Sequence, residues 1–284
     1  MRIVMRPKLR LSTKTSFLLT VLFVCSFASH AVVGEEQPLE AKIGTLPTKP
    51  KLPDPAPATA TATPVVTGSV EGQVTYIGKA PPVLRLVGPG TLISGVLLRA
   101  GIPDESLLVD PKTDGIANVF VYLRKAPPGY VRVVPKASVP FAQRGFQFAP
   151  HAFTVQTGQA IAYSNRDPVG SSVHWLPDRN RGINRSAPAA PAGFSVSFPI
   201  EERTPIRVAS DLESWMRAYM LIQDHPFMAV TDSNGNFSIT GLPPGTHEFV
   251  VWHERGQTLV RKLPVTITAG KVTKLPLSYL ATRF

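Results

Sequence analysis

The sequence predicts an all-β protein with one or two domains. Proline and glycine are frequent, at 29 and 21 of 284 residues, which suits short strands joined by many turns. Apolar and polar residues alternate in several stretches, as they do in half-buried strands, and no uninterrupted helical period is longer than about three turns. A chain of 284 residues is long enough to bury one or two hydrophobic cores.

The N-terminus reads as an export signal. Five basic residues precede the apolar run "FLLTVLFVCSFA", Phe17 to Ala28, and "SHA", Ser29 to Ala31, offers a small-x-small cleavage site. The run is shorter than the roughly 20 residues that a transmembrane helix needs, although a retained anchor is the alternative. We therefore expect residues 1–31 to be a signal peptide and the protein to be exported, to the periplasm or outside the cell.

Charge and cysteine content exclude several function classes. Removing residues 1–31 takes away five basic and no acidic residues, so the net charge falls from +11 to +6. The remaining basic residues are scattered and are not interleaved with aromatic residues, which argues against nucleic-acid binding. Cys25 is the only cysteine, and it lies in the signal. The exported part therefore has no disulfide, no thiol nucleophile and no thiolate metal ligand.

The segment after the signal has the composition of a tether. "PLEAKIGTLPTKPKLPDPAPATATATP", Pro38 to Pro64, is rich in proline, alanine and threonine and has no aromatic residue. Such a segment cannot bury enough apolar surface to order itself. We expect residues 32–67 to be a disordered linker.

The first strands are expected soon after Gly68. Residues 70–76 alternate in "GSVEGQVTYIGKAPP" and turn at Gly78, and residues 117–123 alternate in "IANVFVYLRKAPPG" before two prolines. Further strands follow much later: "DSNGN", Asp232 to Asn236, predicts a hairpin turn, "GLPPG" a second turn, and residues 246–253 a strand. "KLPVTITAGKVTKLPLSYL" adds two more strands around a glycine turn.

The early and late strands together resemble a known family. The order "G-x-V-x-Y-x-G", "ANVFVYL", "AVTDSNGNFSITGLPPGTHEFVV", "VTITAGKVTKLPL" is similar to the carboxypeptidase regulatory-like, transthyretin-type sandwich, with His247 where that family usually has tyrosine. The resemblance implies a discontinuous sandwich, residues 68–134 plus 224–284. A second domain, residues 135–223, would be inserted in it or packed on it, as loops of sandwiches allow.

The inserted segment resembles the cupredoxins, the blue-copper electron carriers. "FQFAPHAFTVQTGQAIAYSNRDPVGSSVHWLP" runs strand, tight turn, strand and polar exit, and "WMRAY" and "DHPFMAVTD" follow. The similarity is greatest to secreted bacterial cupredoxin-like proteins of the methylamine-utilisation type. It covers most of residues 68–284 and implies a Greek-key cupredoxin-like sandwich packed with a transthyretin/Ig-like one.

That resemblance also identifies the positions of the copper ligands. The family uses one histidine past an Asn-x-Asp-Pro exit and a Cys-x-x-His-x-x-Met loop, which supply two imidazoles, a thiolate and an axial thioether. In this sequence the first imidazole position falls on Ser171, the thiolate on Ser210 and the second imidazole on Glu213, while Met216 keeps the thioether. The resemblance therefore implies a degenerate copper site, and we expect no bound copper and no other cofactor.

Other candidate sites are weaker. His151, His174, Glu213 and Met216 are substitute ligands in an alternative hypothesis of a non-thiolate metal site, but no spacing forces them together. Asp232 begins a run that imitates a calcium loop, but its glycine is at the wrong step and no bidentate glutamate follows. We expect His225 to hydrogen-bond backbone at the domain junction. No nucleophile elbow, HExxH, P-loop or Rossmann motif is present.

These observations favour a non-catalytic exported protein, a binding or structural accessory at the cell envelope. Its expected partners are an envelope protein or a glycan, with no nucleic acid, and with a membrane only through an uncleaved signal segment. Two alternatives remain: a metal-binding or redox protein that uses the substitute ligands, and a carbohydrate-binding module, which exposed aromatic clusters would favour.

Overall fold

A computed structural model describes residues 66–284. This part is built almost wholly from strands, with one short 3-10 turn, η1 (Ala281–Arg283), so the predicted all-β class is confirmed. The expected signal peptide, residues 1–31, and nearly all of the expected linker, residues 32–67, lie outside the described residues. Between residues 66 and 284 no helix is long and apolar enough to cross a bilayer.

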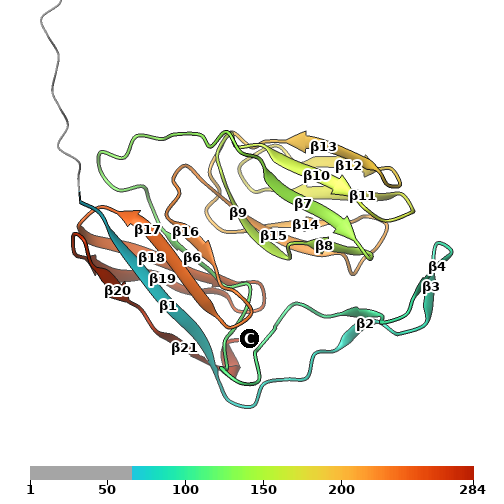
Figure 1. The fold of residues 1–284 in the computed structure, drawn as a ribbon, viewed down its shortest axis with the longest axis horizontal. Coiled ribbons are helices and arrows are strands. Elements are labelled where there is room, and N and C mark those ends of the chain that lie inside the picture. Colours follow the sequence, from blue (N-terminus) through green and yellow to red (C-terminus); the bar gives the residue numbers. More distant parts are fainter. Residues whose placement is uncertain (1–65) are drawn as a thin grey trace, which may run out of the picture. The chain divides into compact units, whose positions relative to one another are not determined.

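Two sheets form the first sandwich, which joins the early strands to the late ones (Figure 1). One sheet has the order β17-β1-β20, with β21 also pairing with β1: β1 Gly68–Ile77, β17 Asn236–Leu242, β20 Val272–Lys274 and β21 Leu277–Leu280. The other has the order β16-β6-β18-β19: β16 Met228–Val230, β6 Phe120–Leu123, β18 Gly245–His253 and β19 Gln257–Ile267. Both sheets contribute side chains to one buried cluster.

Two further sheets form the second sandwich, from the middle of the chain (Figure 1). One has the order β13-β10-β7-β8: β7 Val139–Arg144, β8 Gln147–Ala149, β10 Ile161–Asn165 and β13 Ala192–Val196. The other has the order β12-β11-β14-β15-β9: β9 Ala152–Gln156, β11 Ser171–Leu176, β12 Ile183–Ala187, β14 Ile206–Ala209 and β15 Arg217–Gln223. Their core is rich in aromatic residues, with Phe141, Tyr163 and Trp175 within one cluster.

A third buried cluster joins the two sandwiches. Tyr122 and Trp252, on the outer face of the β6 and β18 sheet, pack with Ala152 of β9 and Leu221 of β15. All four residues of β6 are buried, because this strand has a core on each face. That burial explains why the β6 sequence is apolar throughout instead of alternating. Where the chain divides into domains, at residues 134/135 and 223/224, stays a prediction.

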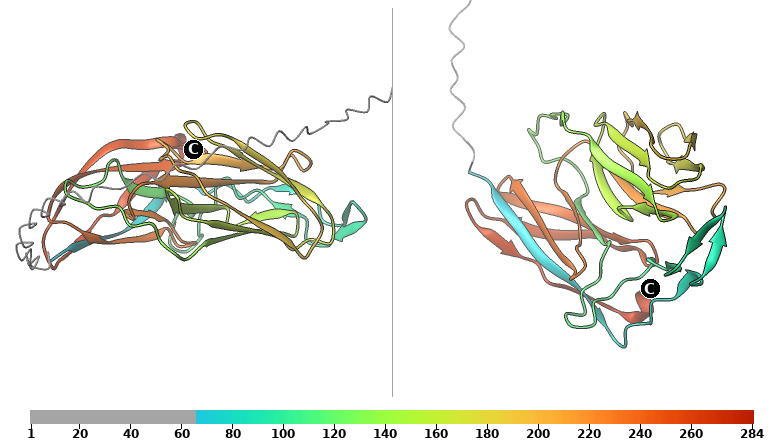
Figure 2. Two further views of the ribbon diagram at one scale, coloured as in Figure 1. Left: turned by 90° about the horizontal axis from the view of Figure 1, so that it is seen from above. Right: turned by 45° about the vertical axis from the view of Figure 1, so that its right-hand side comes forward.

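A short arm leaves the first sandwich after β1. It contains β2 (Arg85–Val87) paired with β5 (Ile102–Pro103), and β3 (Thr91–Ile93) paired with β4 (Val96–Leu98). Figures 1 and 2 show it in teal, running away from the end of β1. Ile102 is buried in the core of the second sandwich, so the arm continues from the first sandwich along the chain and packs on the second.

Two local expectations need correction. The strand predicted from Ala117 begins only at Phe120, because Asn118 has a left-handed φ of 63° that interrupts extended backbone. The "DSNGN" turn is present, but it is not a hairpin: β16 and β17 belong to different sheets. Asp232 Oδ1 accepts hydrogen bonds from the Asn234 and Asn236 amides at 2.9 and 2.8 Å, which turns the chain from one layer to the other.

Candidate functional site

The loop between β14 and β15, residues 210–216, is closed by its own backbone. The Ser210 amide donates to the Met216 carbonyl at 3.2 Å, and the Met216 amide donates to the Glu213 carbonyl at 2.9 Å. These bonds turn the Glu213 side chain back toward β14. The same loop carries three of the four positions that the resemblance assigns to copper ligands.

The structure brings three of these four positions together at one point. Ser171, the first residue of β11, lies with its Oγ 3.2 Å from Ser210 Oγ. Both hydroxyls donate to Glu213 Oε2, Ser210 at 2.8 Å and Ser171 through a short hydrogen bond. At most 7% of any of these three residues is exposed. We call this group the Ser-Ser-Glu cluster.

Local backbone bonds complete the Ser-Ser-Glu cluster. Ser210 Oγ also accepts hydrogen bonds from the amides of Leu212 and Glu213, at 3.2 and 3.1 Å. Among the described residues, the buried side-chain atoms that lack a hydrogen-bond partner include none from Ser171, Ser210 or Glu213. A buried polar group is stabilising only when it is paired, and here the pairs are internal. The cluster therefore needs no added ligand to be satisfied.

The end of the loop, Trp215 and Met216, is a packing element. Met216 is 1% exposed and lies in the core of the second sandwich. Trp215 packs against the same core and donates its indole N–H to the Phe146 carbonyl at 3.1 Å. This hydrogen bond holds the loop against the turn between β7 and β8, so Trp215 and Met216 anchor the loop end whether or not it holds a metal.

The donor set does not fit blue copper. Two serine hydroxyls and a carboxylate stand where a trigonal copper site has two imidazoles and a thiolate. Both hydroxyl hydrogens point at Glu213, so metal binding would have to break the Ser-Ser-Glu cluster. Within residues 66–284 no group of three or more His, Cys, Asp or Glu side chains is arranged to hold a metal ion.

His174 lies away from the Ser-Ser-Glu cluster. Three positions separate it from Ser171 on β11, so alternation puts the two side chains on opposite faces of the sheet. His174 Nδ1 lies 3.1 Å from Asp211 Oδ1, and Asn184 donates to the other oxygen of Asp211 at 2.5 Å. His174 therefore fixes the outer side of the loop.

His151 belongs to a charged network at the junction of the two sandwiches. Its Nε2 lies 2.5 Å from Glu254 Oε1 and its Nδ1 lies 3.4 Å from Glu105 Oε2. Arg217 is 3.6 Å from Glu254 and donates to Asp104 at 3.1 Å. The structure thus engages both ring nitrogens of His151 with carboxylates and does not bring His151 and His174 to Glu213.

Charge explains the protonation of two histidines in this junction. Burial alone would lower the pKa of His151, but the hydrogen bonds and negative charges of Glu105 and Glu254 outweigh it and raise the pKa to about 9. Burial, followed by repulsion from His151 and Arg255, lowers the pKa of His253 to about 3. At neutral pH His151 is a cation, which is not the form that ligates a metal.

Two other histidines differ in how they are paired. His247 Nε2 lies 2.8 Å from the Pro243 carbonyl. His225 is fully buried, and neither ring nitrogen makes a well-formed hydrogen bond among the described residues, so the expected bond to backbone is reduced to a weak contact with the Leu123 main chain. Its ring lies against Phe227 instead, with centroids 5.7 Å apart. Burial lowers the pKa of His225, so the ring sits there uncharged.

Sequence reasoning missed the junction network and the charged turn around Glu202. Glu105 and Glu254 lie far from His151 in the chain, and no motif links them. Glu202 stands in "IEERTP", a charged run that ordinarily faces solvent, yet only 1% of it is exposed. The signal that was available in the sequence is its place just before the alternating apolar residues Ile206 and Val208.

No family model and no curated protein matches the chain. Solved structures that are similar to part of it include a purple cupredoxin from Nitrosopumilus maritimus, at 11% identity over 30% of this chain and 100% of that one, TM-score 0.26. Amicyanin from Paracoccus versutus is 14% identical over 32% of this chain and 85% of that one, TM-score 0.25. A copper-containing nitrite reductase from Thermus scotoductus is 11% identical over 34% of this chain and 25% of that one, TM-score 0.27. Each of these similarities covers about a third of this chain.

Proposed function

We propose that this chain is an exported, non-catalytic β-sandwich protein that serves as a binding or structural accessory at the cell envelope. In this proposal the middle of the chain is a degenerate cupredoxin domain that keeps the scaffold and has given up copper. The observation that carries the proposal is the Ser-Ser-Glu cluster, in which Ser171, Ser210 and Glu213 satisfy one another in the place of the strong ligands.

The two alternative functions have less support. The substitute-ligand hypothesis needs His151 and His174 at one point with Glu213, but Glu254 and Asp211 hold the two histidines elsewhere. A carbohydrate-binding module ordinarily stacks sugars on exposed aromatic rings. The exposed large apolar side chains among the described residues are all valine, leucine or isoleucine. We therefore prefer a binding or structural accessory without a copper centre over these two alternatives.

Restoring the ligands tests whether the loop is a former copper site. The triple change Ser171→His, Ser210→Cys, Glu213→His places two imidazoles and a thiolate beside Met216, and we expect it to give an intense visible charge-transfer band with one equivalent of Cu(II). The double change Ser210→Cys, Glu213→His lacks one imidazole and is the matched control, which should give a weaker or unstable colour. A folded triple variant that stays colourless with copper would contradict the proposal.

A further inference from the structure

A second site lies where the two sandwiches meet, at the other end of β14 and β15 from residues 210–216. It is a cleft of about 390 Å³. The first sandwich contributes residues of β6, β18 and β19, and the second contributes the segment 201–204 and the end of β15. Its volume falls in the lower part of the range of small-molecule sites.

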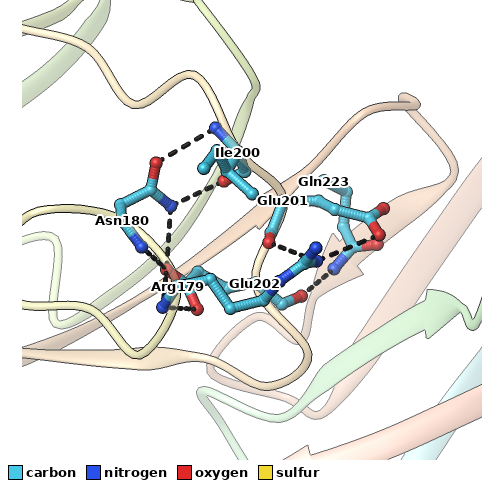
Figure 3. Close-up of polar contacts among 6 residues, drawn as sticks. All are labelled: Arg179, Asn180, Ile200, Glu201, Glu202 and Gln223. Carbon is cyan, nitrogen blue, oxygen red and sulfur yellow. Dashed lines mark hydrogen bonds and ion pairs between the residues drawn. The ribbon is translucent and has the colours of Figure 1, made fainter.

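A buried carboxylate, Glu202, lies in one wall of this cleft, and Figure 3 shows its polar contacts. Glu202 Oε1 accepts hydrogen bonds from the backbone amides of Arg179 and Asn180, both at 3.0 Å, and from Asn180 Nδ2 at 2.8 Å. The Glu202 carbonyl accepts from Gln223 Nε2 at 2.7 Å. Neutral N–H donors within the wall thus hydrogen-bond the Glu202 carboxylate, which keeps its negative charge.

The same wall is tied to its neighbours on both sides. Asn180 donates to the Ile200 carbonyl at 2.7 Å and accepts from the Ile200 amide at 3.0 Å, as Figure 3 shows. Across the junction the Tyr122 hydroxyl donates to the Arg203 carbonyl at 3.1 Å. The backbone that carries Arg203 is therefore held in place at the cleft, although its side chain is exposed.

Positive charge dominates the lining. Cationic side chains outnumber carboxylates five to two: Arg124, Lys125, Arg179, Arg203 and Arg261 against Glu201 and Glu202. Arg124 pairs with Glu248 at 3.1 Å and Arg179 with Glu201 at 3.2 Å. Within residues 66–284, Lys125, Arg203 and Arg261 have neither an ion pair nor a side-chain hydrogen bond. Three cations therefore line a preformed cleft without an ion-pair partner, and they outnumber the one lining carboxylate, Glu202, that has no cationic partner either.

We propose that this cleft binds a multiply charged oxyanion of the phosphate class, as the free ion or as an ester. Guanidinium groups present fixed pairs of N–H donors that match phosphate oxygens, and two of the three uncompensated cations are arginines. A ligand with a single carboxylate would leave positive charge in the cleft uncompensated, whereas a phosphate group carries close to two negative charges at neutral pH. This inference goes beyond the proposed function and holds whether or not residues 210–216 bind copper.

Calorimetric titration of the full chain tests the proposal with four probes: inorganic phosphate, pyrophosphate, glucose 6-phosphate and glucose. We expect saturable binding of the phosphates at low salt with Kd of about 1 mM or tighter, weakening as salt screens the charges, and none of glucose. Tighter binding of glucose 6-phosphate than of inorganic phosphate would identify an ester, and the reverse would identify the free ion. Both results support the proposal.

Matched surface variants localise the binding. Arg203→Ala and Arg261→Ala should each weaken pyrophosphate about tenfold, the effect of losing one charge-assisted hydrogen bond. Arg207→Ala and Lys262→Ala remove exposed cations that do not line the cleft and should leave the affinity unchanged. Equal losses in all four variants, no phosphate binding by the unmodified chain, or binding of single-stranded DNA without any binding of small phosphates would overturn the proposal.

Discussion

At the scale of single residues, Ser171, Ser210 and Glu213, the positions that the resemblance assigns to copper ligands, form a closed hydrogen-bond group. The Ser210 hydroxyl donates a hydrogen bond to Glu213 and accepts hydrogen bonds from two backbone amides. The Ser210 amide donates to the Met216 carbonyl and so closes the loop. Glu213 depends on both serines for donors. Because all of these atoms are shielded from water, each lost partner leaves another group unpaired.

Ser210→Ala should therefore lower the free energy of unfolding by about 1–3 kcal/mol, the cost of leaving a buried polar group unsatisfied. Urea denaturation followed by tryptophan fluorescence measures the loss. Ser195→Ala is the matched control, since Ser195 is exposed on β13 in the same sandwich, and it should change stability by less than about 0.5 kcal/mol. A Ser210→Ala protein as stable as the control would show that the Ser-Ser-Glu cluster contributes nothing.

At the scale of elements, the charged junction network ties β9 to the turn after β18. His151 precedes β9, and its partner Glu254 follows β18, so their hydrogen bond joins the two sandwiches. Arg217 at the start of β15 forms ion pairs with both Glu254 and Asp104. Asp104 directly follows β5, so the end of the arm is part of the same network. Its strength depends on the protonation of His151.

The unfolding free energy should fall as the pH rises above neutrality. The pKa of His151 is about 9 in the folded protein and 6.5 in the unfolded chain. A raised folded pKa contributes stability that is fully present below pH 6.5 and is lost as the pH rises through about 9. Chemical denaturation at several pH values between 6 and 10 measures the decline.

His151→Gln provides the control for this decline. Glutamine cannot take up a proton, so the variant should be less stable at pH 6 and should lose less stability between pH 6.5 and 9 than the unmodified protein. If both proteins lost the same unfolding free energy between pH 6.5 and 9, the decline would be due to groups other than His151.

Sequence patterns anticipated the elements better than the contacts between them. Alternation at residues 70–76 and 246–253 predicted β1 and most of β18, and the resemblance placed Ser171, Ser210 and Glu213 where they meet. The His151 and Glu254 pair was out of reach, because it joins residues 103 positions apart that no local pattern relates. The arm from β2 to β5 was also missed, since its strands are only two or three residues long.

At the scale of the described molecule, the sheet that contains β6 and β18 is buried on both faces along β6 and the second half of β18. Its inner face belongs to the core of the first sandwich, and its outer face packs on β9 and β15 of the second. Trp252 is central to that outer face: its ring lies 5.6 Å from Phe120 and 5.2 Å from Tyr219, between ring centroids. Loss of this packing should therefore affect both sandwiches.

Trp252→Ala should lower the free energy of unfolding by about 3–5 kcal/mol, as large-to-small changes of buried aromatic residues do. In native-state hydrogen exchange, the amides of Val121 in β6 and Val173 in β11 should lose protection by similar amounts. Val272→Ala, at a half-exposed position of β20, is the control and should leave both unchanged. Lost protection at Val121 with full protection at Val173 would mean that the two sandwiches unfold independently.

The most direct test of the central claim is a calorimetric titration of Cu(II) into the full chain. The experiment uses a Cys25→Ser background, which removes the one thiol in the sequence. Because hydroxyls and a carboxylate replace the imidazoles and the thiolate, we expect no stoichiometric site of sub-micromolar affinity. One equivalent of tightly bound copper that is lost in His174→Ala or in Glu213→Gln would contradict the degenerate-site account and would establish a metal site built from substitute ligands.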